Sequence, residues 1–133
     1  MRFRKITIIQ TSRPSEATVN EQLQWLGGSL GLFNPRDKDK SCFRIFITLI
    51  KSTRRGRELS SDELAALTGL SRGTVVHHLN KLMSAGIVET YRGKYVLRVG
   101  QLHELIDKLE DDLRKTVSQL RAVAADIDKR LGP

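Results

Sequence analysis

At 133 residues, the chain has room for one ordinary domain with an appendage, and its 39% hydrophobic content suffices for a small core. The 23 basic and 15 acidic side chains give a net charge of +8, which favours a polyanionic partner. The lone Cys42 excludes an intrachain disulfide and a cluster of thiolate metal ligands. We expect Cys42 to be a small core residue in a cytoplasmic, nucleoid-associated protein.

No segment is apolar for long enough to cross a bilayer, because the longest apolar run, Ile45–Ile50, is far shorter than the roughly 20 residues required. The N-terminus is basic and then apolar, but its apolar part is too short for a signal peptide and lacks a small-residue cleavage site. We therefore expect a mature protein with no membrane contact.

The first 40 residues are predicted to form a strand, a helix and a loop. A β-branched run that starts at Ile6 predicts a short exposed strand ending near Thr11. Thr18 and the glutamate three residues later have the spacing of a capping box, so a helix is expected to follow and to end at Gly31. Turn-forming and charged residues over 34–40 predict a solvated loop.

Residues 41–51 are apolar on most sides, and periodicity alone does not separate a buried helix from a buried strand. A helix is predicted because a helix-turn-helix pattern follows. Ser60 and Glu63 form a second capping-box pattern, and the short helix after them is expected to end at Gly69. Ser71 then caps a second helix, predicted over Ser71–Ser84, whose buried stripe comprises Val75, Leu79 and Leu82.

The outer face of this second helix has the chemistry that reads base pairs. Arginine and asparagine can form paired hydrogen bonds to guanine and adenine, threonine and valine can touch the thymine methyl, and lysine can meet phosphate. Gly73 lets the backbone come close to the DNA, whereas His78 is expected to pack against the core. The predicted DNA-contacting residues of the helix are Arg72, Gly73, Thr74, Val76, His77, Asn80 and Lys81.

Residues 87–98 read as two β-rich arms joined by a tight turn at Arg92-Gly93, which predicts a wing. Arg92 and Lys94 at its tip suit a phosphate backbone or the adjacent minor groove. Residues 72–100 as a whole hold five basic side chains and one acidic side chain, which supports a nucleic-acid surface.

The runs Thr-Val-Val-His-His-Leu-Asn-Lys-Leu, from Thr74, and Ala-Gly-Ile-Val, from Ala85, resemble the winged helix-turn-helix of ArsR-like prokaryotic transcription regulators, archaeal ones in particular. The resemblance covers about residues 42–98 and implies a homodimer that regulates transcription. Metal-sensing members of this family carry a cysteine pair in the helix before the turn, or ligands along the last helix. Here residues 62–68 contain no cysteine, and His103 is the only histidine in the last helix. We therefore expect no metal and no cofactor.

The C-terminal segment has an apolar heptad seam, which predicts a coiled coil with a second copy of the chain. A helix over 99–131 would be roughly 48 Å long, too long to bury itself against so small a domain. The predicted dimer interface comprises Leu102, Ile106, Leu109, Leu113, Leu120, Val123 and Ile127.

The sequence therefore predicts a mainly α protein with a small β wing, divided into an N-terminal extension (1–40), a DNA-binding domain (41–99) and a dimerisation helix (100–133). The expected function is sequence-specific binding of double-stranded DNA. A chromatin-like protein without sequence preference and a winged-helix protein adaptor are the alternatives. No phosphate loop or catalytic nucleophile indicates an enzyme, and nothing in the sequence identifies a small-molecule effector.

Overall fold

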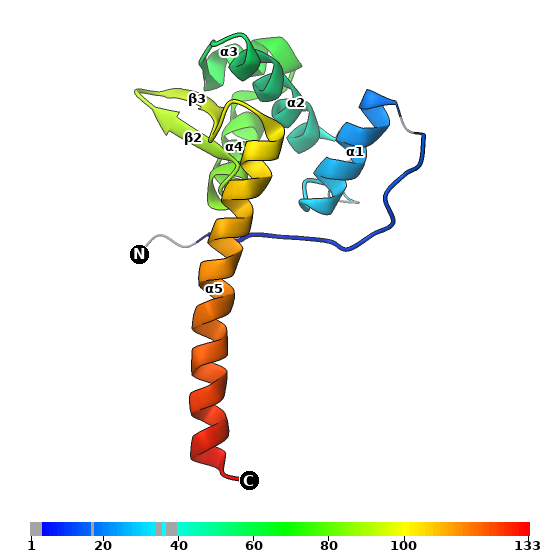
Figure 1. Ribbon diagram of the computed structural model, residues 1–133. Helices are drawn as coiled ribbons and strands as arrows, with labels where there is room; N and C mark the ends of the chain where they lie inside the picture. Colours follow the sequence, from blue (N-terminus) through cyan, green and yellow to red (C-terminus); the bar gives the residue numbers. More distant parts are fainter. Residues whose placement is uncertain (1–3, 17, 34–35, 37–39) are drawn as a thin grey trace.

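The computed structural model describes residues 4–16, 18–33, 36 and 40–133. A helical domain carries a small sheet on one side, and one long helix extends away from it (Figure 1). The mainly α fold with a β wing is therefore confirmed. The elements in chain order are α1 (Val19–Ser29), α2 (Ser41–Arg54), β1 (Leu59–Ser60), α3 (Ser61–Thr68), α4 (Arg72–Ser84), β2 (Val88–Tyr91), β3 (Lys94–Leu97) and α5 (Leu102–Leu131).

Three of the helices begin at the caps that the sequence predicts. The Thr18 and Ser71 hydroxyls accept hydrogen bonds from backbone N–H groups in the first turns of α1 and α4. At α3 the capping box is complete, because the Ser60 hydroxyl and the Glu63 carboxylate each accept from the other residue's backbone N–H. The helical interpretation of residues 41–51 is also correct, since α2 spans this range.

The sheet has three antiparallel strands in the order β1-β3-β2. Val88 pairs with Leu97 and Tyr91 with Lys94, so the predicted hairpin is confirmed. Its turn has φ of +53° at Arg92 and +76° at Gly93, and two positive φ values in succession define the type I′ turn that suits a two-residue hairpin. β1 is only two residues long, and pairing with β3 alone makes it a strand.

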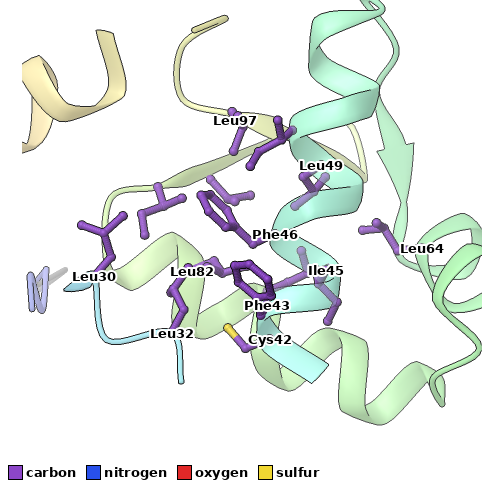
Figure 2. Packing of buried hydrophobic residues seen from close by; sticks show 14 of the residues in the cluster. Leu30, Leu32, Cys42, Phe43, Ile45, Phe46, Leu49, Leu64, Leu82 and Leu97 are labelled. Carbon is purple, nitrogen blue, oxygen red and sulfur yellow. The ribbon is translucent and has the colours of Figure 1, made fainter. Parts of the chain in front are cut away.

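The core is centred on α2, whose Ile45, Phe46 and Leu49 are completely buried (Figure 2). The stripe of α4 predicted to face inward is also completely buried, and Cys42 lies in the same cluster as expected. The cluster also receives Leu30 and Leu32 from the end of the N-terminal extension and two leucines from α5. All three predicted segments thus contribute to one core.

The predicted N-terminal strand is wrong. Residues 4–11 run extended across the molecule but belong to no sheet (Figure 1). The Lys5 N–H donates to the Ser84 carbonyl at 2.8 Å, and the Ile9 N–H donates to the Ser29 carbonyl at 2.7 Å. β-branched residues favour extended backbone, but a strand also needs a neighbouring strand, and here helix ends take that place. Of the predicted loop over 34–40, residues 34–35 and 37–39 lie outside the described residues.

The long helix α5 begins against the domain and then leaves it (Figure 1). Leu105 and Leu109 are buried, whereas most side chains in the second half of the helix are exposed. Among the described residues, none of the helices combines the length and apolar character that a membrane span needs.

Candidate nucleic-acid interface

Helix α4 presents the face that the sequence assigns to DNA. Val75, Leu79 and Leu82 point into the core, which turns the opposite face outward. His78, expected to pack inward, is half-buried and makes an edge contact with the His77 ring, their centroids 5.1 Å apart. Thr74 is half-buried, and the exposed candidates are Arg72, Gly73, Val76, His77, Asn80 and Lys81.

The turn between α3 and α4 is held from both sides. Gly69 ends α3 with a φ of +71°, and the Thr68 hydroxyl donates to the Leu64 carbonyl at 2.6 Å. The Arg44 guanidinium reaches across from α2 and donates to the Thr68 carbonyl. These contacts tie the end of α3 to α2 and hold the start of the turn that leads into α4.

Two acidic residues at the start of α3 contact the basic surface, which sequence reasoning missed. Asp62 Oδ1 lies 3.4 Å from Arg72 Nε. Glu63 pairs with both Arg57, at 3.2 Å, and Lys94 of the wing, at 3.4 Å. The basic partners are 48 to 73% exposed and Glu63 is 34% exposed, so each pair contributes little to stability. The basic side chains remain exposed at the surface although they are paired.

The surroundings of Glu63 lower the pKa of its carboxyl group. Hydrogen bonds from the Ser60 backbone and hydroxyl, with a smaller contribution from Lys94, lower the pKa of Glu63 from 4.5 to about 2. Glu63 is therefore ionised at neutral pH and keeps a negative charge between α3 and the wing.

The wing ends in an aromatic and basic tip. The Arg92 guanidinium stacks on the Tyr91 ring at 5.0 Å from its centroid, and Tyr91 is exposed. The Thr90 hydroxyl donates to the Lys94 carbonyl at 3.0 Å, which braces the turn. Arg92 and Lys94 are both exposed, as a phosphate contact requires.

The apolar seam of α5 divides into two parts. Leu109 is only 3% exposed, and Leu102 is half-buried, because both pack against the core of their own domain. Leu109 therefore has little surface left for a partner, whereas the assignment of Leu102 to the dimer interface stays a prediction, because the heptad pattern does not distinguish the chain's own core from a partner. The remaining seam is 37 to 63% exposed and comprises Ile106, Leu113, Leu120, Val123 and Ile127.

Within the described part of the chain, His, Cys, Asp and Glu side chains gather nowhere in a group of three that could hold a metal ion. His103 lies exposed on α5.

Comparison with known families agrees with this geometry. Residues 49–90 match the family described as bacterial regulatory protein, arsR family. The match runs from the second half of α2 through both helices of the helix-turn-helix into β2. A search of curated proteins found no relative that matches the chain. The predicted resemblance is thus confirmed over this region, which matches the helix-turn-helix domain of a family of DNA-binding transcription regulators.

Proposed function

We propose that this ArsR-family regulator domain serves a homodimer that reads a two-fold symmetric site in double-stranded DNA. One observation carries the proposal: the polar face of α4 and the apolar seam of α5 are both exposed, and they lie on separate parts of the molecule. Each surface has the chemistry of a different partner. Neither surface is covered by another element of the described chain.

Helix α4 enters the major groove in this proposal. Arg72 and Asn80 can form paired hydrogen bonds to purine edges, and Thr74 and Val76 can contact thymine methyl groups. His77 and Lys81 complete the face, and Gly73 leaves room for the backbone at the first turn. The wing residues Arg92 and Lys94 meet the phosphate backbone or the adjacent minor groove.

The exposed part of the α5 seam is the proposed dimer interface. Apolar side chains at heptad spacing over Ile106–Ile127 would otherwise remain in water, and a parallel copy of the same helix buries them. Two-fold symmetry then carries two α4 helices to successive major grooves, about 34 Å apart on one side of the duplex. The dimer therefore requires a pseudo-palindromic target, and its place in the cell is the nucleoid.

Selection from random duplexes at physiological salt tests this proposal. We expect enrichment of a two-fold symmetric motif, bound at least about a thousandfold more tightly than random duplex. The Asn80→Ala protein, selected in parallel, serves as the control that links the motif to α4.

Other outcomes of the selection would replace the proposal with one of its alternatives. Tight binding without an enriched motif would favour a chromatin-like protein that coats DNA through its charge. Absence of DNA binding at moderate salt would favour a protein adaptor, in which the same exposed faces contact another protein.

A further inference from the structure

Three segments far apart in the sequence meet at the carboxylate of Asp112 on α5. Arg98, directly after β3, donates from Nη1 to Oδ2 at 2.5 Å and from Nη2 to Oδ1 at 3.3 Å. Arg4, from the N-terminal segment, donates from Nη1 to Oδ2 at 2.5 Å. The Asp112 and Arg98 side chains are only 13% and 15% exposed, and Arg4 covers the pair at 45% exposure. Partly buried, bidentate pairs of this kind are the strong ones.

The cluster also touches the end of the DNA-reading helix. Gly86 lies in the turn between α4 and β2, and a Cβ placed there would be 3.4 Å from both Arg98 Nη1 and Asp112 Oδ2. With a φ of +77°, this turn favours glycine and lets the ionic cluster approach its backbone. The Lys5 N–H donates to the carbonyl of Ser84, the last residue of α4. The cluster therefore joins α4, the base of the wing and the N-terminal segment to α5.

Asp112 also marks the point at which α5 leaves its own domain. Leu105, Leu109 and Asp112 follow one another at four and three residues, so they lie on the same face of the helix. All side chains of α5 after Asp112 are exposed, apart from the half-buried Val117. Apolar packing is non-directional, so the two leucines constrain the direction of α5 only weakly. The ion pairs have a fixed geometry and constrain it more strongly.

We propose that Asp112 is the positioning residue that fixes the angle between α5 and α4, and thereby the spacing of half-sites that the dimer accepts. This inference rests on the proposed dimeric function. Through Arg98 and Arg4, Asp112 prevents α5 from pivoting about Leu105 and Leu109. Because α5 carries the dimer seam, a small change of this angle is magnified over the distance to the partner's α4.

Rigid linkage of two DNA-reading helices raises affinity, because binding of the first half-site places the second helix at its own half-site. A flexible linkage lowers this effective concentration and accepts several spacings. Hydrogen bonds from Arg98 and Arg4 also keep the pKa of Asp112 below its usual value, so the carboxylate is ionised at neutral pH. Replacing Asp112 by asparagine retains its size but removes the charge that holds both arginines.

The test compares the full-length wild type with Asp112→Asn, and with Asp107→Asn as the matched control. Asp107 is exposed on another face of the same helix and undergoes the same change of charge. Each protein is titrated with four duplexes: the site selected by the wild type, the same site with its centre lengthened or shortened by one base pair, and a single half-site. Circular dichroism and sedimentation confirm that each variant is folded and dimeric.

We expect Asp112→Asn to bind the full site about tenfold more weakly than the wild type, with unchanged affinity for the half-site. Its discrimination against the altered spacings should fall by a similar factor, while Asp107→Asn behaves as the wild type does. Equal spacing discrimination by Asp112→Asn and the wild type would overturn the inference. A wild type that binds none of the duplexes specifically would instead refute the proposed function, so the two failures are distinguishable.

If Asp112→Asn does not fold, Arg4→Gln provides the same test. Arg4 is the outer and more exposed partner, and Arg98 still holds Asp112 in this variant. We expect a smaller loss of spacing discrimination, in the same direction. Discrimination equal to that of the wild type would overturn the inference here too.

Discussion

Helices α4 and α5 both carry an apolar stripe, but they bury it in different ways. The stripe of α4 is completely buried within the chain. The stripe of α5 is fully buried only at Leu105 and Leu109, and from Leu113 onward its apolar side chains are exposed, apart from the half-buried Val117. Both helices have the same kind of pattern, and only the size of the domain decides how much of it can be covered.

This difference separates two tasks. A helix whose apolar stripe is covered leaves its polar face available for a polar ligand, which we propose for α4 to be a set of base edges and phosphates. A helix whose stripe is only partly covered keeps an apolar surface that is unfavourable in water and that a second copy can bury. Substitutions in the α5 seam, on the outward face of α4, in the wing and at the cap of α3 test this difference.

The largest effect is expected at the seam. Replacing Leu113 and Leu120 together by aspartate should raise the dimer dissociation constant by roughly ten-thousandfold, because the dimer loses four buried leucines at about 1.5 kcal/mol each. Sedimentation equilibrium should report monomers, and these monomers should bind half-sites weakly. Ser118→Asp, exposed on the other side of α5, is the control and should leave the dimer intact. A double variant that remains dimeric would show that the dimer interface lies elsewhere in the chain.

The reading face of α4 should show the next largest effect. Arg72→Ala or Asn80→Ala should cost about 1 to 3 kcal/mol of binding free energy at selected base pairs and relax the preference there. Titration against a set of single-base variants of the selected site measures this loss. Gln119→Ala removes the same amide from exposed α5 and should change nothing. A uniform loss of affinity across all DNA sequences would show that Asn80 contacts the DNA backbone and not a base.

The wing should affect all duplexes alike. Arg92→Ala or Lys94→Ala should weaken every duplex and reduce the slope of log affinity against log salt by roughly one. Arg121→Ala removes an equal charge from exposed α5 and should leave this slope unaltered. An unchanged salt slope in Arg92→Ala would show that the wing does not contact the DNA backbone.

The smallest effect is expected at the cap of α3, and it depends on pH. Because folding lowers the pKa of Glu63 from 4.5 to about 2, its contribution to stability is present above pH 4.5 and is lost as the pH falls towards 2. Melting temperatures of the wild type and Glu63→Gln, measured between pH 7 and pH 2, should therefore converge in the acidic range. Parallel curves over the whole range would show that the ionised carboxylate does not stabilise the cap.

Local features were predictable from the sequence because they depend on neighbours in the chain. Thr18, Ser60 and Ser71 cap helices through residues only three positions away. The wing turn at Arg92-Gly93 depends on two backbone conformations. The outward face of α4 followed from the spacing of its buried stripe, and the family match over residues 49–90 agrees with the pattern.

Features that depend on distant residues were not predictable. β1 is a strand only because it pairs with β3, and the residues around Ile6 lack such a neighbour. Asp112 is 108 residues from Arg4, and no local pattern joins them. Leu109 and Leu120 both fall on the predicted heptad seam, although Leu109 is buried in its own domain and Leu120 is exposed. Periodicity reports that a face is apolar, but it does not report what covers it.

The most direct test of the central claim is the number of chains bound to one selected duplex, measured by sedimentation velocity at protein concentrations above the dissociation constant. We predict two chains on a full site, and two chains on the same duplex when one half-site is scrambled, with a weaker affinity. One chain per duplex at saturation would contradict the account, because the exposed seam of α5 would then not join two copies of the chain.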